Sequence, residues 1–174
     1  MDELIEAHPG KWLLVAGPRS LRHTMSALIS RLAEVGPVDV LDGANQFDAY
    51  AIARSLRGRP ELLQRIQVAR MFTCYQVLAS LEKATRKETP FIVLNLLGTF
   101  YDEAVNYGER RRLLDRSIQQ LVDLSARAAV LVSVQPPAQI SPQAQTLFTI
   151  LYSAAPEASI QEMPVPAPGP LRLF

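Results

Sequence analysis

Residues 13–24, LLVAGPRSLRHT, contain the clearest candidate for chemistry in this chain. An apolar run ends at Gly17, and the eight residues from Gly17 to Thr24 fit the outer frame of a phosphate-binding loop. Such a loop reads G-x-x-x-x-G-K-[ST] between a strand and a helix. Arg22 and His23 replace its inner glycine and lysine. The segment is therefore either a loop that has lost its phosphate chemistry or an ordinary turn.

Each departure from that frame weakens phosphate binding. Pro18 lacks a backbone N–H, and phosphates are held mainly by N–H groups. The long side chain of Arg22 occupies space that a phosphate would need, and His23 is shorter than lysine and provides no fixed positive charge. Thr24 keeps a hydroxyl that suits magnesium. An alternative hypothesis is that Arg19, Arg22 and His23 hold an anion at a helix N-terminus without hydrolysis.

Alternating strands and helices must position these residues. Four short runs rich in Val, Ile and Leu are expected to be buried strands, at residues 12–16, 38–41, 91–97 and 128–134. Three segments with apolar residues at three- and four-residue spacing are expected to be helices, at residues 21–35, 47–56 and 109–127. This alternation predicts an α/β domain with a mostly parallel central sheet flanked by helices.

Two segments need separate treatment. Residues 61–87 are either one long helix or a strand in IQVARMF followed by a helix from about Cys74 to Lys87. After the loop PPAQISPQ, the runs TLFTILYS and ASIQEM, joined by AAPE, predict an antiparallel hairpin at the sheet edge. The last segment, MPVPAPGPLRLF, has proline at every second position from 164 to 170, which predicts an extended tail.

Composition restricts the class of protein. The chain has 174 residues, 48% hydrophobic and 20% charged, which suits one soluble domain. A net charge of +1 provides no strong field toward nucleic acid or anionic membranes. A single cysteine, Cys74, excludes an internal disulfide and predicts a cytoplasmic protein. An acidic start and the lack of an 18-residue apolar run predict neither a signal peptide nor a membrane span.

The order of these segments resembles the ATPase core of the RecA/RadA recombinase superfamily, over roughly residues 11–163. VDVLDGANQF supplies Asp42 after the second strand but has Ala44 where the family has its catalytic Glu. FIVLN ends in Asn95 at the metal-associated Asp position of the Walker B strand. Gln135 falls at the family's polar sensor position.

The segment IQVARMFTCYQVLASLE also matches a pattern of that family, in which a strand precedes a helix. The resemblance therefore favours the strand-then-helix interpretation of residues 61–87. It implies a single RecA-like core domain at residues 1–163, followed by the tail at 164–174.

The same resemblance implies a protein without ATPase activity. Ala44 cannot orient or deprotonate a water, and Asn95 offers no carboxylate to magnesium. We expect no catalytic residue, no cofactor and no metal. The resemblance implies an accessory or regulatory protein that acts through protein contacts in DNA repair or recombination, either self-associated or bound to a recombinase-like subunit. The alternative is a module that binds a nucleotide or anion through the altered loop without hydrolysis.

Two further groups are candidates for contacts with partners. Arg110, Arg111 and Arg112 could contact nucleic-acid phosphates, although Glu109 beside them favours the solvated start of a helix. The tail presents apolar side chains at its end, which would dock on a partner or on the chain's own core: Leu171, Leu173 and Phe174.

Overall fold

The computed structural model describes residues 9–138 and 141–160. Within them, six parallel strands form one sheet in the order β3-β2-β4-β5-β1-β6. The strands are β1 (Trp12–Ala16), β2 (Val38–Asp42), β3 (Ile66–Arg70), β4 (Phe91–Leu94), β5 (Val130–Val134) and β6 (Glu157–Ile160). The helices are α1 (Leu21–Val35), α2 (Ala49–Ser55), α3 (Cys74–Ala84), α4 (Tyr107–Ser125) and α5 (Pro142–Ala154), with a short 3-10 helix, η2 (Pro60–Arg65).

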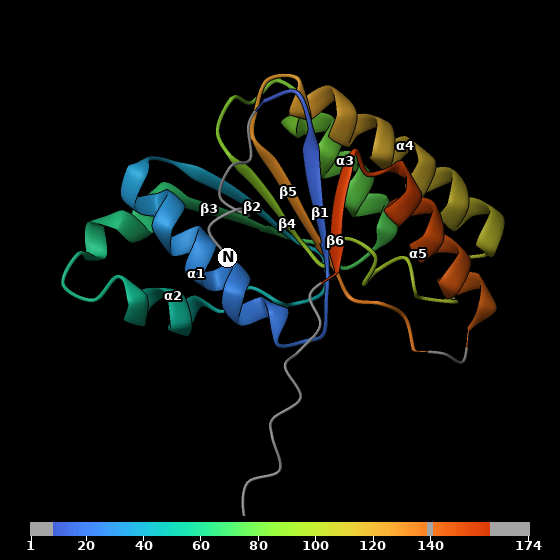
Figure 1. The fold of residues 1–174 in the computed structure, drawn as a ribbon, viewed down its shortest axis with the longest axis horizontal. Helices are drawn as coiled ribbons and strands as arrows, with labels where there is room; N and C mark the ends of the chain where they lie inside the picture. Colours follow the sequence, from blue (N-terminus) through green and yellow to red (C-terminus); the bar gives the residue numbers. More distant parts are fainter. Residues whose placement is uncertain (1–8, 139–140, 161–174) are drawn as a thin grey trace, which may run out of the picture.

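Helices cover both faces of the sheet. Helices α1 and α2 lie on one face, and α3, α4 and α5 lie on the other (Figure 1). Side chains of β1 alternate between the two cores: Trp12 and Leu14 pack with α3–α5, and Val15 packs with α1. Trp12 is completely buried. The expected α/β architecture with a parallel sheet and flanking helices is confirmed.

The ambiguous segment is a strand followed by a helix. Strand β3 pairs in parallel with β2, and α3 begins after Thr73, whose hydroxyl accepts a hydrogen bond from the N–H of Gln76. This N-cap satisfies a donor of the first helical turn and fixes where the helix starts. The alternative of one long helix over residues 61–87 is wrong.

The predicted antiparallel hairpin is also wrong. TLFTILYS belongs to α5, and β6 runs parallel to β1. Ser141 caps α5 by accepting from the N–H of Ala144, and Pro142 at the first helical position has its φ already suited to a helix. Leu147 and Leu151 are fully buried and lie one helical turn apart, so that the apolar stripe faces the core.

Candidate functional site

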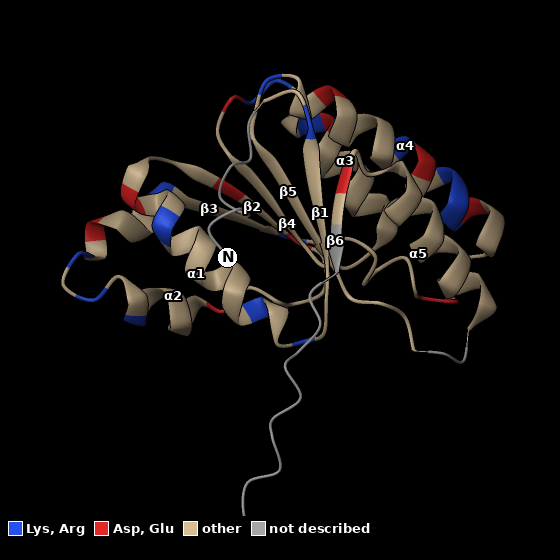
Figure 2. Ribbon diagram, viewed as in Figure 1, with Lys and Arg blue, Asp and Glu red and all other residues tan. Residues whose placement is uncertain are grey.

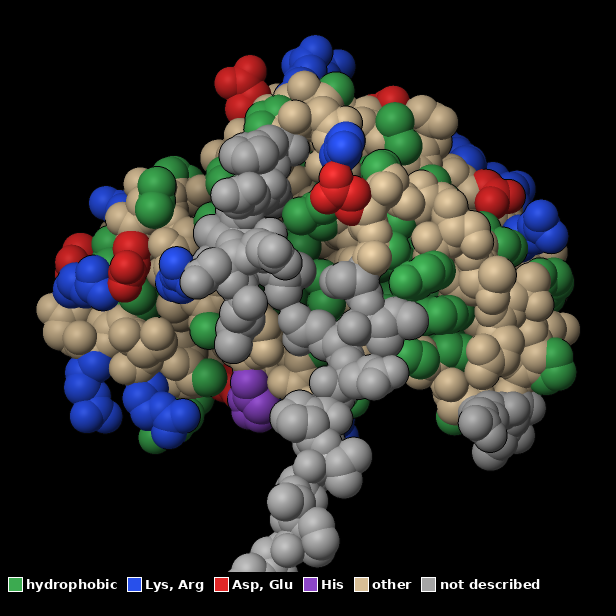
Figure 3. All heavy atoms as spheres, viewed as in Figure 1, with side chains coloured by type: hydrophobic (Ala, Val, Ile, Leu, Met, Phe, Trp, Pro, Cys, Tyr) green, Lys and Arg blue, Asp and Glu red, His purple; other side chains and the backbone are tan. Residues whose placement is uncertain are grey.

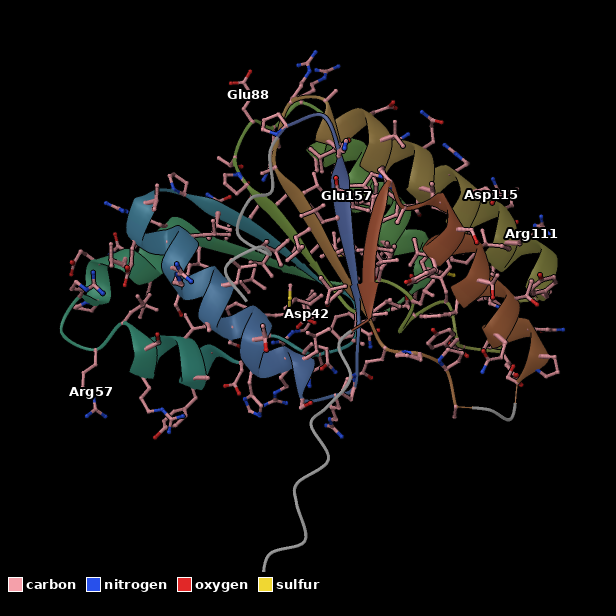
Figure 4. The ribbon with its side chains drawn as sticks, in the orientation of Figure 1. Asp42, Arg57, Glu88, Arg111, Asp115 and Glu157 are labelled. Atoms are coloured by element: carbon pink, nitrogen blue, oxygen red, sulfur yellow. The ribbon has the colours of Figure 1, made fainter. Side chains whose placement is uncertain are left out.

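The carboxyl ends of four neighbouring strands bring together most of the residues singled out in the sequence. Asp42 ends β2, Asn95 follows β4 and Gln135 follows β5, while Gly17 follows β1. The Gly17 N–H donates to the carbonyl of Val134 at 3.1 Å, which ties the first loop to the end of β5. Figure 4 shows Asp42 at this end of the sheet, where the strands converge. Ligands of open parallel sheets bind at such an edge.

The loop between β1 and α1 is closed by its own hydrogen bonds. Only residues 17–20 separate the strand from the helix, which starts at Leu21 as expected. The N–H groups of Leu21, Arg22 and His23 donate to the carbonyls of residues 18, 19 and 20, at 2.9, 3.2 and 3.0 Å. These three donors point into the loop's own turn. A phosphate cradle instead needs N–H groups directed at the ligand.

The side chains of this loop are not gathered around a binding site. Arg19 and His23 are exposed, and Thr24 is half-buried. Arg22 forms an ion pair with Asp48, with 2.7 Å between Nη2 and Oδ2. An incoming phosphate would have to compete with a carboxylate for this guanidinium.

Asp48 has a second role as the N-cap of α2. Its Oδ1 accepts from the N–H of Ala51 at 2.9 Å. That backbone hydrogen bond and the Arg22 guanidinium both favour the carboxylate form, and they lower the pKa of Asp48 from its ordinary value. Arg22 therefore links the first turn of α1 to the first turn of α2.

Asp42 organises the loop that follows β2. Its side chain is completely buried and accepts from the N–H groups of Gln46 at 2.7 Å and Phe47 at 3.1 Å. The Nε of Arg70, on the neighbouring strand β3, lies 3.4 Å from its Oδ2. Because these contacts are all within the chain, Asp42 is engaged in holding the loop.

Two glycines allow the loops after β2 and β4 to pack against each other. A Cβ on Gly43 would lie 2.7 Å from the backbone oxygen of Asn95, which is closer than real Cβ atoms come. A Cβ on Gly98 would overlap the Cβ of Ala44. Ala44 thus contacts the opposite loop.

Asn95 connects the ends of β4 and β5 through hydrogen bonds. Its backbone has φ of +48°, a conformation that asparagine adopts more readily than most residues. Its N–H donates to Ser133 Oγ at 3.0 Å, and its Oδ1 accepts from the N–H of Gln135 at 3.1 Å. The Tyr101 hydroxyl donates to the carbonyl of Gln135 at 2.9 Å, and burial raises the pKa of that phenol. Asn95 and Gln135 are thus joined to each other.

In the described part of the chain, neither a cluster of metal ligands nor an exposed thiol lies at this edge. Among residues 9–138 and 141–160, no three His, Cys, Asp or Glu side chains gather closely enough to hold a metal ion. Cys74 is buried, and burial raises the pKa of its thiol, which disfavours the nucleophilic thiolate.

The three arginines of α4 have three different environments. Arg111 is exposed and lies with Asp115 on the outer side of the helix (Figure 4). Arg112 forms an ion pair with Glu109 at 2.7 Å, and this hydrogen-bonded pairing lowers the pKa of Glu109. Acidic and basic residues are mixed along α4 (Figure 2). The expected solvated helix start holds for Arg111 and Arg112.

Arg110 is the exception, because only 1% of it is exposed. Its Nη1 donates to the carbonyl of Phe100 at 3.0 Å, and its Nη2 donates to Gln143 Oε1 at 2.6 Å. The expectation that Arg110 would lie on a solvated or DNA-facing surface is therefore wrong. Arg110 is the fourth residue of α4 and lies on the same buried side of the helix as Leu113 and Leu114, three and four residues later. This spacing was the signal in the sequence that Arg110 faces the core.

The edge strand β3 forms an exposed surface that the sequence motifs did not indicate. Residues 67–70 are exposed, and Val68 is 40% exposed. Phe72, just after the strand, is 73% exposed. Beside β3 lies a cavity of about 230 Å³ whose lining includes Val68, Ala69, Ser80, Lys83 and Phe91. The combination of a free strand edge, exposed apolar side chains and an adjacent cavity is typical of a protein-binding surface.

Other surfaces carry weaker signals. On the face drawn in Figure 3, basic and acidic side chains are interspersed and form no large patch of one sign. No helix within the described ranges is both long and apolar enough to cross a bilayer. The candidate docking residues Leu171, Leu173 and Phe174 lie outside the described residues.

No family model matches the chain, and no curated protein matches it. Function therefore has to be inferred from the geometry of the chain itself.

Proposed function

We propose that this protein is a non-catalytic RecA-like subunit that acts through protein–protein contacts, linked to DNA repair or recombination. The observation that carries the proposal is a contrast between two regions. The groups that would bind and cleave a nucleotide are replaced or bonded within the chain, whereas the outer edge of β3 has no pairing strand in the described part of the chain.

The lack of catalysis is supported by three positions. His23 is exposed and stands where a P-loop has its lysine. Ala44 packs toward Gly98, and Asn95 holds Gln135. Phosphoryl transfer depends on positioning and on neutralisation of charge. None of these three side chains positions the reacting groups or neutralises their charge.

The contact surface that we assign is the free edge of β3. Within residues 9–138 and 141–160, strand β3 pairs with β2 on one side only, so that the N–H and C=O groups of its other side are available to another chain. A partner strand would add to the sheet there, and an apolar side chain beside it would fill the cavity next to Val68 and Ala69. This mode would join the subunit to a second copy of itself or to a recombinase-like subunit, the two kinds of partner that the resemblance implies.

The test compares two exposed valines. Val68 on β3 is 40% exposed, and Val122 on the outer face of α4 is 45% exposed. We expect Val68→Lys to abolish self-association, or association with the recombinase of the same organism, in sedimentation velocity. Val122→Lys is the matched control and should leave the association unchanged. A protein that stays monomeric and binds no recombinase, or equal effects of both variants, would contradict the proposal.

The alternative function, anion binding by Arg19, Arg22 and His23, has less support. Arg22 is paired with Asp48, and the N–H groups at the start of α1 are bonded within the loop. Calorimetry that detected micromolar binding of ATP to the wild-type protein would favour this alternative.

A further inference from the structure

A cavity of about 600 Å³ opens between the loop that precedes α4 and the start of α5. It lies outside the altered phosphate loop and away from the edge of β3. Its lining combines the apolar Val105 and Pro142 with polar residues: Glu103, Asn106, Tyr107, Arg110, Ser141 and Gln143.

Among the described residues, the buried guanidinium of Arg110 has no carboxylate in direct contact. Arg110 is 1% exposed, yet no carboxylate lies within 4.0 Å of its guanidinium in the described part of the chain. Its two hydrogen-bond acceptors, the carbonyl of Phe100 and the amide oxygen of Gln143, are both neutral. Arg110 Nε is buried and has no partner among these residues. A guanidinium has five N–H donors, and burying one without a counter-ion is unfavourable.

Two helix N-termini add positive potential at the same place. Asn106 is the N-cap of α4 and Ser141 is the N-cap of α5, and both line the cavity. Each helix has more than three turns, so that its unpaired N–H groups and dipole favour an anion at this end. The buried guanidinium of Arg110 provides a full charge between them.

We propose that this cavity binds a carboxylate group, with Arg110 as its cationic partner. A guanidinium, with its planar arrangement of N–H donors, is the side-chain group that best matches the oxygens of a carboxylate. Glu103 lines the same cavity and accepts from Ser141 Oγ at 3.1 Å. The negative charge of Glu103 repels a polyanion, so the cavity suits a ligand group with a single negative charge. A free organic acid and a Glu or Asp side chain of another protein both provide that group.

The first experiment titrates the full-length protein with simple probes, followed by NMR shifts of backbone amides around the cavity. Propionate represents a free acid, and the blocked peptide Ala-Glu-Ala represents a protein side chain. Blocked Ala-Gln-Ala is the neutral control. We expect saturable shifts near Ser141 and Asn106 with one or both carboxylates. Saturation by propionate alone assigns a free acid, and saturation by the peptide adds a protein source.

The second experiment places a carboxylate of the protein itself beside Arg110. Gln143→Glu places a carboxylate where Oε1 now accepts from Arg110 at 2.6 Å. We expect this variant to bind the probes at least about tenfold more weakly and to melt at a higher temperature. Gln145→Glu, an exposed position on the same helix, is the matched control and should bind as the wild type does.

Three results would overturn the proposal. One is the absence of saturable shifts with either carboxylate. Another is equal binding by the wild type and Gln143→Glu, which would indicate contact elsewhere. The third is tighter binding of single-stranded oligonucleotides than of carboxylates at the same amides, which would make the cavity a phosphate site.

Discussion

The guanidinium of Arg22 and the carboxylate of Asp48 lie 2.7 Å apart, and they join two helices whose first turns are separated by a whole strand in the sequence. One partner occupies the glycine position of a phosphate-binding motif, and the other caps α2. A residue that would obstruct phosphate binding thus has a structural role.

This ion pair makes stability depend on pH. The pKa of Asp48 is lowered in the folded protein from its ordinary value of 3.8. The carboxylate therefore stabilises the fold above the unfolded-state pKa, and this contribution is lost as the pH falls through the lower folded-state pKa. Asp48→Asn keeps a good N-cap but removes the charge. We expect it to melt below the wild type at pH 7, with a difference that becomes smaller as the pH falls below 3.8.

The measurement is thermal unfolding followed by circular dichroism at pH 7 and pH 2. Asp115→Asn is the control, because Asp115 is exposed on α4 and makes no ion pair within the described residues. A melting difference for Asp48→Asn that stays constant between pH 7 and pH 2 would contradict the assigned role of the charge.

Hydrolysis of nucleotides should be absent. We expect no release of phosphate from ATP or GTP above background, with or without single-stranded DNA. The double substitution Arg22→Gly with His23→Lys restores the motif but leaves Ala44 and Asn95 unchanged. It should therefore not restore turnover, although it could restore nucleotide binding because the Asp48 pair is removed. Phosphate release by the wild type that disappears in His23→Ala would refute this expectation.

The contact between the loops after β2 and β4 predicts that one substitution lowers the stability of the protein and that a second one restores part of it. Gly98→Ala should destabilise the protein by about 1–3 kcal/mol, because the new methyl group overlaps Ala44. Adding Ala44→Gly should recover part of the loss. Gly108→Ala is the control, since its Cβ would meet its nearest neighbour at an ordinary 3.6 Å. Chemical denaturation measures all four proteins, and an equal loss for Gly98→Ala and Gly108→Ala would disprove the contact.

Regular parts of the fold were predictable because their signals are local. Residues 12–16 and 21–35 have the expected bounds, since Gly and Pro interrupt the pattern on either side. The run TLFTILYS was misleading because its β-branched and aromatic residues are typical of strands. Its helical signal was the preceding Ser141-Pro142, an N-cap followed by proline at the first helical position.

The candidate sites were predictable to a smaller extent. The sequence places Gly17, Asp42, Asn95 and Gln135 after strands, and parallel pairing then brings them to one edge. Their partners depend on contacts between distant residues, which no spacing reveals. The burial of Arg110 follows from the packing of α4 against α5, whose helical nature was itself missed.

The position of Trp12 gives the protein a built-in optical reporter. It is the chain's one tryptophan, it is fully buried, and its indole N–H has no partner among the described residues. It lies on β1, between β5 and β6, with its side chain among the residues under α3, α4 and α5. Its fluorescence therefore reports the integrity of this core, whereas events at the distant edge of β3 leave it unchanged. Emission at short wavelength in a variant of the β3 surface would show that lost association is not lost folding.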